Sequence, residues 1–401
     1  MRTNGATSMI TRRTATAGLA ALTALAARAK PARAAPPIRL GIALSLSGNL
    51  GDSGAEFFRG VELWQEQVNA RGGILGRQTE LVRYDDRSDP ATAARLYERL
   101  ITSDNVDLLL SPWGSASCAT ASAVAEKHKR VFVNAGGAAE SIHLRGFKYV
   151  FQSAPPISAY VSGIGPLAQR YGFKTIAFVS RDYSAARDMA RVLDTIAKSG
   201  NLTIVMAEYF PAGTSDFSAN IARARQLDPD IWIGVGYPNE AIEQIRQFRA
   251  VNYLPKVFIH NGASQDDFLN ATGKDGEYAV PMSLYEPVLK TEGNVEFVQA
   301  FKAKYGMAPG YYSAFPFQGA TVLERAVAKT GSLDQDKLRE TLTTFETDGI
   351  MGHHKVNPVT YGQIGLTGLL DQVRGGKREI IAPEPLKTID AVLPMPAWDK
   401  R

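Results

Sequence analysis

The stretch from residue 38 to residue 86 constrains the fold more than any other part of this chain. Residues 38–44, IRLGIAL, form a nearly continuous apolar run, which is typical of a strand buried inside a parallel sheet. A small, polar loop follows at 45–54, and apolar residues then recur at helical spacing over 57–68. Residues 79–84 predict a second strand. Together these segments predict a βαβ unit whose first loop lies at the carboxyl end of a strand, where open α/β sheets bind ligands.

Four motifs in this stretch carry a resemblance to a known family: Ser47-Gly48, Arg59-Gly60, Asn69-Ala70-Arg71-Gly72-Gly73-Ile74-Leu75-Gly76 and Tyr84-Asp85-Asp86. In order and spacing they are similar to the opening of the periplasmic solute-binding proteins of the Leu/Ile/Val-binding type, the type I receptors of ABC importers. The resemblance extends to about residue 375. It implies an α/β fold of two doubly wound lobes, joined by a three-strand hinge and closing around a ligand.

The first 34 residues differ in charge from the rest of the chain. They hold six basic residues and no acidic one, which leaves 39 Lys and Arg against 40 Asp and Glu, a net charge of −1. The basic balance of the whole chain is therefore no reason to expect nucleic-acid binding. Arg12-Arg13, the mildly apolar run at 15–27 and Ala32-Arg33-Ala34 predict an export signal cleaved near Ala34, by the twin-arginine or the ordinary secretory route. We therefore expect a soluble, periplasmic mature protein.

Strand and helix patterns alternate twice along the chain. The first series ends near residue 152, and the second runs from about 175 to 260. Such alternation predicts two doubly wound lobes. From the resemblance we assign three crossings between them, near residues 154, 284 and 348. The first lobe would comprise residues 35–154 and 285–348, the second lobe residues 155–284 and 349–390, and residues 391–401 would form a tail. Prolines recur after Pro383, so we expect this tail to be loose.

The strongest candidate site is the predicted strand, loop and helix at 106–129. A helix start offers unpaired backbone N–H groups and the positive end of the helix dipole. Gly114 lets an anion approach closely and Ser115 adds a hydroxyl donor, which together suit a carboxylate, although Ser115 could equally cap its own helix. The resemblance places the carboxylate-binding serine of the family at Ser115. Trp113 beside it would face the cleft or belong to the core.

The resemblance places further ligand contacts in other loops. They fall on Ser53 in the first loop, on Gly136 and Ala138 in the fourth, on Tyr183 and Tyr237 in the second lobe, and near Asn261 and Gly262. Both tyrosines follow strand ends, where a phenol can stack on a ligand and donate a hydrogen bond.

Two of these positions depart from the amino-acid-binding members of the family. Those members commonly have a hydroxyl where Ala138 stands and an acidic residue near Gly262, which together hold the ammonium group of the ligand. Burying an ammonium without a partner is costly. We therefore hypothesise a ligand without an α-amino group, although Asp266 or Asp267 could fill the acidic role. With aromatic residues near the cleft, an aromatic carboxylate or aromatic 2-oxo acid is favoured.

The expected function is capture of a small carboxylate outside the cytoplasm, with no catalytic residue, metal or cofactor. By resemblance, the closed form would dock on the membrane permease of an ABC importer, and we expect a monomer that binds no nucleic acid. A branched-chain amino acid receptor of the same fold is the nearest alternative. A ligand-sensing module and an exported hydrolase are alternatives of another class, and no nucleophile, base and orienting group can be assembled from the sequence to support the hydrolase.

Overall fold

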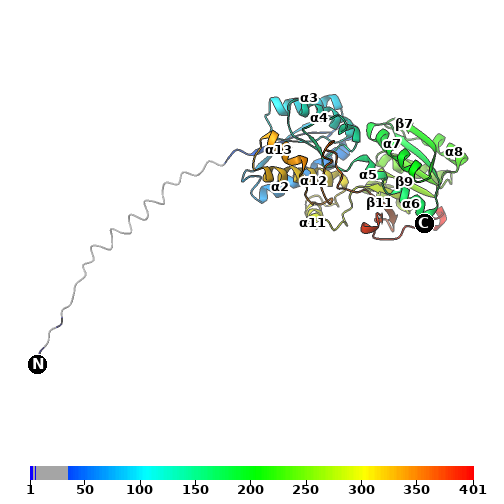
Figure 1. Cartoon of the computed structure of the whole chain (residues 1–401). Coiled ribbons are helices and arrows are strands. Elements are labelled where there is room, and N and C mark those ends of the chain that lie inside the picture. Colours follow the sequence, from blue (N-terminus) through cyan, green and yellow to red (C-terminus); the bar gives the residue numbers. More distant parts are fainter. Residues whose placement is uncertain (3–4, 6–34) are drawn as a thin grey trace. The chain divides into compact units, whose positions relative to one another are not determined.

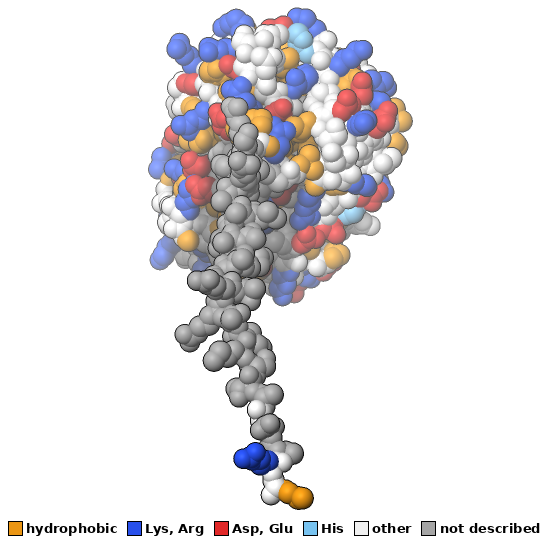
Figure 2. Space-filling model, turned by 90° about the vertical axis from the view of Figure 1, so that its left-hand side faces the viewer, with side chains coloured by type: hydrophobic (Ala, Val, Ile, Leu, Met, Phe, Trp, Pro, Cys, Tyr) orange, Lys and Arg blue, Asp and Glu red, His pale blue; other side chains and the backbone are white. Residues whose placement is uncertain are grey.

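The computed structural model describes residues 1–2, 5 and 35–401, so most of the predicted signal peptide lies outside the described residues. Residues 1–36 and 37–401 are separate units, and the larger unit contains two α/β lobes (Figure 1). Within the described part of the chain, no helix combines the length and the apolar character that a membrane crossing requires. Figure 2 shows basic and acidic side chains interspersed on the face in view, in keeping with the near-zero net charge of residues 35–401.

A five-stranded sheet with the order β2-β1-β3-β4-β5 forms the centre of the first lobe. All neighbouring strands pair in parallel. In β1, every residue except Arg39 is buried, which explains why its sequence is apolar on both faces. The strands are β1 (Ile38–Leu44), β2 (Thr79–Asp85), β3 (Leu108–Leu110), β4 (Phe132–Asn134) and β5 (Val150–Gln152).

Helices cover both faces of this sheet (Figure 1). Leu108 and Leu110 pack in one apolar cluster with α2 and α12, whereas Leu109 packs in another with α3 and α4, as alternation along a strand requires. Gly60 allows α2 to lie against α12, because a Cβ atom there would be 2.1 Å from the carbonyl oxygen of Ser313. The helices are α2 (Gly51–Ala70), α3 (Pro90–Thr102), α4 (Ser115–Lys127), α11 (Asn294–Tyr305), α12 (Tyr311–Thr330) and α13 (Gln335–Thr343).

The second lobe repeats this topology in a seven-stranded sheet with the order β12-β11-β10-β9-β8-β6-β7. Its five parallel strands follow the same order as the first sheet, and an antiparallel hairpin extends the edge. The prediction of two doubly wound α/β lobes is therefore confirmed. The strands are β6 (Thr175–Arg181), β7 (Thr203–Phe210), β8 (Ile231–Val235), β9 (Val257–His260), β10 (Val280–Ser283), β11 (Leu369–Arg374) and β12 (Lys377–Ala382).

The helices of the second lobe also divide between the two faces of its sheet. Helices α6 and α7 pack in one apolar cluster with Phe178, and α8, α9 and α10 pack in another with Trp232. The helices are α5 (Ile157–Val161), α6 (Ile164–Tyr171), α7 (Ser184–Ser199), α8 (Ser218–Leu227), α9 (Pro238–Ala250) and α10 (Asp266–Thr272).

Residues 349–363, which we assigned to the second lobe, contact β5 of the first through Tyr361 and Gln363. The backbone N–H of Gln152 donates to the carbonyl oxygen of Tyr361 at 2.9 Å, and the rings of Phe151 and Tyr361 stack with centroids 4.8 Å apart. The N–H of Gln363 donates to Oε1 of Gln152 at 3.1 Å. The lobe boundaries stay a prediction, but these contacts move our placement of the third crossing to residues 364–368, immediately before β11.

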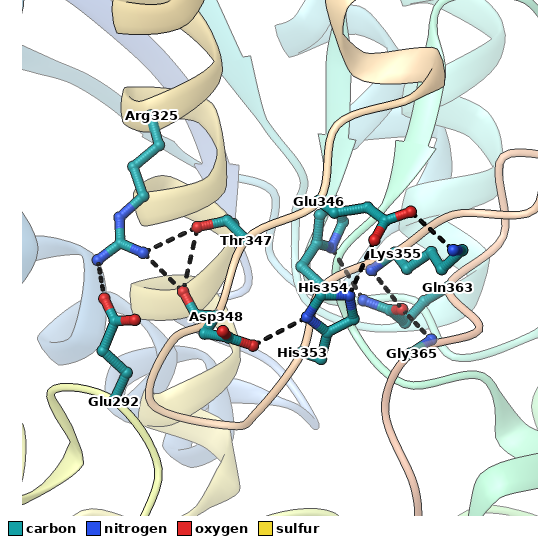
Figure 3. Close-up of polar contacts among 10 residues, drawn as sticks. All are labelled: Glu292, Arg325, Glu346, Thr347, Asp348, His353, His354, Lys355, Gln363 and Gly365. Carbon is teal, nitrogen blue, oxygen red and sulfur yellow. Dashed lines mark hydrogen bonds and ion pairs between the residues drawn. The ribbon is translucent and has the colours of Figure 1, made fainter.

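Thr347 and Asp348, which immediately precede this segment, are bonded to α12 (Figure 3). Nη1 of Arg325 donates to Oγ1 of Thr347 at 2.8 Å and to the carbonyl oxygen of Asp348 at 2.6 Å. His353 lies between the carboxylates of Asp348 and Glu346, at 2.8 Å and 3.2 Å. Hydrogen bonding to Asp348, and then to Glu346, raises the pKa of His353.

The C-terminal tail, residues 391–401, packs on the second lobe although its prolines suggested a loose segment. The N–H of Met395 donates to the carbonyl oxygen of Lys256 at 2.8 Å, and Nε1 of Trp398 donates to that of Tyr253 at 3.2 Å. The side chains of Met395 and Trp398 join the apolar cluster around Trp232. Burial of these two large side chains holds the tail in place.

Candidate functional site

All ten predicted ligand contacts follow the carboxyl ends of strands. In each sheet the strand that comes first in the chain, β1 in the first lobe and β6 in the second, lies between the next two strands. The direction in which the strands are added therefore reverses beside it. At such a switch point, neighbouring loops lead to helices on opposite faces and leave a crevice between them. Ser53 follows β1; Trp113, Gly114 and Ser115 follow β3; Gly136 and Ala138 follow β4; Tyr183 follows β6; Tyr237 follows β8; Asn261 and Gly262 follow β9.

A cavity of about 160 Å³, here named the switch-point cavity, receives residues from the loops after β1, β3, β6 and β8. Its walls include Leu50, Gly114 and Ser115 from the first lobe and Tyr183 and Tyr237 from the second. A cavity of about 150 Å³ is large enough to hold a benzene ring. The switch-point cavity therefore has room for a ligand built on one aromatic ring.

Helix α4 begins at this cavity without a side-chain cap. Its N-cap residue, Gly114, has φ of +92°, a conformation that favours glycine. The hydroxyl of Ser115 accepts the backbone N–H of Ala139 at 3.2 Å, so it joins two loops instead of capping its own helix. The first N–H groups of α4 therefore have no intrahelical partner and are oriented to receive an acceptor, as an anion would be.

Gly136 fixes the loop after β4 against the loop after β3. Its N–H donates to Oγ of Ser111 at 2.9 Å, and its carbonyl oxygen accepts the N–H of Gly114 at 3.1 Å. A Cβ atom on Gly136 would lie 2.0 Å from the carbonyl oxygen of Pro112. The structure thus brings Gly136 next to the candidate site as a packing element, while half-buried Ala138 follows in the same loop. A ligand contact at either residue stays a prediction.

The two predicted tyrosines lie together on the wall contributed by the second lobe. The ring centroids of Tyr183 and Tyr237 are 6.3 Å apart. Burial raises the pKa of Tyr237 to about 12, with nearby Arg181 acting in the opposite direction. Burial also raises the pKa of Tyr183. Both phenols therefore keep their protons at neutral pH and, having no hydrogen-bond partner among the described residues, remain free to donate.

Asn261 and Gly262 support the loop that carries Tyr237. Oδ1 of Asn261 accepts the N–H of Gly236 at 3.0 Å, and the N–H of Gly262 donates to Nδ1 of His260 at 2.9 Å. A Cβ atom on Gly262 would lie 2.4 Å from the carbonyl oxygen of Tyr237. This close approach gives a physical reason for glycine at position 262, whatever the ligand.

Trp113 packs inside the first lobe. Only 6% of its surface is exposed, and its ring lies 4.8 Å from that of Tyr312 and 5.6 Å from that of Phe57. Its Nε1 has no hydrogen-bond partner in the part of the chain that the structure describes. These contacts fit a tryptophan of the core more closely than a tryptophan that faces the cleft, the other role we weighed for Trp113.

A second cavity of about 470 Å³, here named the acidic cavity, adjoins the first and shares Tyr237 with it. Ser53, Glu56 and Asp267 are among its lining residues, and the hydroxyl of Ser53 donates to the carbonyl oxygen of Leu50 at 3.0 Å. Burial raises the pKa of Glu56 to about 7, although a hydrogen bond from the Gly310 N–H acts against this. An acidic group does face the cleft, therefore, but not in the switch-point cavity.

Replacing Glu56 with glutamine is expected to stabilise the protein above pH 7. Because the folded-state pKa of about 7 exceeds the ordinary value of 4.5, wild-type stability is lost as the pH rises from about 4.5 through 7. Glutamine cannot ionise, so the variant should gain about 1–2 kcal/mol over wild type at pH 8 and little at pH 5. Urea unfolding at both pH values measures this. An equal difference at the two pH values would show that Glu56 is not the group responsible.

The residues that line these cavities and escaped the sequence analysis include Ser117, Arg181 and Glu56. The sequence contained a signal for Ser117 and for Arg181. Arg181 ends an otherwise apolar strand two residues before Tyr183, and Ser117 lies in the first turn of the helix that begins at Ser115. Glu56 gave no comparable signal, because its environment is made by residues far along the chain.

Comparison with known proteins places the chain among ligand-binding receptors. A sequence model described as "Periplasmic binding protein" matches residues 37–366. The chain is 27% identical over 348 residues to "Leu/Ile/Val-binding protein homolog 7" of Brucella abortus (strain 2308), covering 82% of this chain and 86% of the relative. Both matches span most of the two lobes.

Two solved structures show the same fold. The LivJ protein of Streptococcus pneumoniae, a branched-chain amino acid transporter substrate-binding protein in complex with isoleucine, is 23% identical with a TM-score of 0.76, covering 86% of this chain and 100% of that one. A solute-binding protein of an ABC transporter from R. palustris, in complex with benzoate, is 21% identical with a TM-score of 0.77, covering 86% and 96%. At these identities the likeness concerns the fold and leaves the ligand open.

Proposed function

We propose that this chain, which belongs to the periplasmic binding protein family of solute-binding receptors, captures a small carboxylate without an α-amino group outside the cytoplasm. An aromatic acid or aromatic 2-oxo acid fits best. The receptor would deliver its ligand, chemically unchanged, to the membrane permease of an ABC importer. A monomer suffices for this task, because a single chain supplies both walls of the cavity.

The observation that carries this proposal is the composition of the switch-point cavity. The uncapped start of α4 offers N–H donors to a carboxylate, and none of the residues that line the cavity is Asp or Glu. An ammonium group buried there would lack an anionic partner, which is costly. The rings of Tyr183 and Tyr237 offer apolar faces to a ring of the size that the cavity admits.

Capture then follows from the arrangement of the two lobes. A carboxylate bound at the start of α4 would contact the first lobe, and its ring would contact the tyrosines of the second lobe. Closing the lobes expels water, which strengthens each polar contact in the cavity. The ligand favours the closed form to the extent that it contacts both lobes at once.

A branched-chain amino acid receptor is the second candidate, favoured by the acidic cavity. Glu56 from the first lobe and Asp267 from the second both line it, and it adjoins the switch-point cavity at Tyr237. An amino acid that spanned both cavities would place its ammonium near these carboxyl groups. The solved structure with isoleucine shows that a protein of this fold takes such ligands.

A ligand panel separates the two candidates. Benzoate, 4-hydroxybenzoate and phenylpyruvate are compared with leucine, isoleucine and valine, first by thermal shift and then by titration calorimetry. At least one aromatic acid should bind with a dissociation constant of about 1–10 μM and stabilise the protein by about 2.7 kcal/mol at 100 times that concentration. Micromolar binding of leucine or valine, with none of the aromatic acids, would instead establish the second candidate.

A further inference from the structure

Arg181 brings a cation to the switch-point cavity from the second lobe. It is the last residue of β6, its side chain is 11% exposed, and it lines the cavity together with Ser115 and Tyr183. Its guanidinium lies over the ring of Tyr237, 4.8 Å from the centroid. This stacking holds the planar group against the cavity wall.

Most of the hydrogen-bonding capacity of Arg181 is unused. Nη1 donates to Oε1 of Glu240 at 3.3 Å, and the other N–H groups of the guanidinium have no partner among the described residues. The second oxygen of Glu240 is already engaged, because it accepts the N–H of Tyr237 at 2.9 Å. Glu240 therefore positions Arg181 but leaves it free to bind a further acceptor.

Ser117 faces the cavity from the opposite lobe with an unused hydroxyl. The residue is 3% exposed, it lies in the first turn of α4, and its hydroxyl has no hydrogen-bond partner in the described part of the chain. Because Ser117 lines the cavity, its hydroxyl is available to donate to a bound acceptor. The cavity thus has unused donors on both walls, from Ser117 and the α4 backbone on one and from Arg181 on the other.

We propose that Arg181 is the ligand-binding residue with which the second lobe recognises the carboxylate, so that the anion is held between this guanidinium and the start of α4. The inference rests on the proposed function and adds a reason for closure. A carboxylate that binds donors of both lobes favours the closed form, and charge-assisted bonds to arginine are about twice as strong as neutral ones. A neutral amide of the same shape lacks the charge and turns an N–H₂ group toward the guanidinium.

The test compares the acid that stabilises wild type most in the panel above with its own primary amide, by titration calorimetry. Wild type should prefer the acid by about 100-fold or more. In Arg181→Met, which keeps an unbranched side chain over Tyr237, affinity for the acid should fall by about 100-fold and affinity for the amide by less than about 3-fold. In Arg181→Lys, which keeps the charge without the planar fork, affinity for the acid should fall by about 10-fold.

Arg187→Met is the matched control. Arg187 belongs to the same lobe and pairs with Asp182 at 2.9 Å, but its side chain is 53% exposed and it is not among the residues lining the cavity. Its removal should change affinity for the acid by less than about 2-fold. If Arg181→Met folds poorly, Glu240→Gln provides an independent test, because removing the counter-ion of Arg181 should raise affinity for the acid by about 3-fold.

Failure of this inference is distinguishable from failure of the proposed function. If no acid binds wild type, carboxylate capture is wrong and Arg181 cannot have the role proposed. If an acid binds wild type but Arg181→Met keeps the preference for acid over amide, carboxylate capture stands and the role of Arg181 is overturned. A preference that disappears in Arg181→Met and persists in Arg187→Met supports the proposal.

Discussion

Gly114→Val is expected to weaken ligand binding by about 100-fold or more while the protein remains folded. Gly114 adopts φ of +92°, where a β-branched residue is strained, and a Cβ atom there would lie 3.2 Å from Cδ1 of Leu50. Gly114 and Leu50 both line the switch-point cavity, so the added methyl groups compete with the ligand for space. Displacing the start of α4 would also misdirect the N–H donors proposed to hold the carboxylate.

Gly146→Val separates backbone strain from the loss of the site. Gly146 also has positive φ, +73°, but an added Cβ atom would meet nothing within 4 Å, and the residue is exposed in the loop before β5. Both variants should lose about 1–3 kcal/mol of unfolding free energy. Only Gly114→Val should lose affinity for the acid identified in the panel, measured by calorimetry. Equal affinity losses in the two variants would mean that the effect is not local to the cavity.

Trp232→Ala is expected to lower the free energy of unfolding by about 4–6 kcal/mol. Trp232 is fully buried in β8, its ring lies 4.8 Å from that of Phe248 at a near-perpendicular angle, and Nε1 donates to Oε1 of Gln244 at 2.9 Å. Truncating a buried tryptophan costs about 3–5 kcal/mol. Gln244, whose Nε2 already has no partner in the described part of the chain, would lose the only bond its side chain makes, at a further cost of about 1 kcal/mol.

Trp232→Phe and Trp398→Ala provide the comparison. Phenylalanine keeps most of the ring packing, so Trp232→Phe should lower the free energy of unfolding by about half as much as Trp232→Ala does. Trp398 belongs to the tail and packs on the same cluster. If the tail is docked as observed, Trp398→Ala should lower the free energy of unfolding by about 2–3 kcal/mol. Urea unfolding monitored by circular dichroism measures all three. A loss below about 2 kcal/mol for Trp232→Ala would contradict the central role of this residue in the second lobe.

The sequence predicted the fold and the family correctly because both depend on local patterns. The apolar run 38–44, the helical spacing at 57–68 and the second strand at 79–84 correspond to β1, α2 and β2, and the repeated alternation predicted two lobes. The resemblance to the Leu/Ile/Val-binding type is confirmed by the family match over residues 37–366. The predicted contacts also follow strand ends as expected, since that requires only the positions of the strands.

Other features escaped prediction because they depend on contacts between distant residues. Residues 349–363 contain no signal that assigns them to either lobe; Tyr361 binds β5 through its backbone and stacks on Phe151. We expected a loose tail because prolines mark loops, yet Trp398 is buried against the second lobe. Trp113 likewise stands beside Ser115 in the sequence while its ring packs among Phe57 and Tyr312.

The sequence by itself determined two doubly wound lobes and a helix start at Gly114-Ser115, because strand burial, helix periodicity and turn formation are set by neighbours in the chain. The structure decided that this start is uncapped, because the Ser115 hydroxyl accepts the N–H of Ala139 from another loop. Only the tertiary structure decided the charges that face the cleft. Arg181 and Glu240 are 59 residues apart, and Glu56 and Gly310 are 254 residues apart, yet each pair is in hydrogen-bond contact. Whether a charged side chain is buried, paired or free to bind a ligand depends on such partners, and folding alone brings them together.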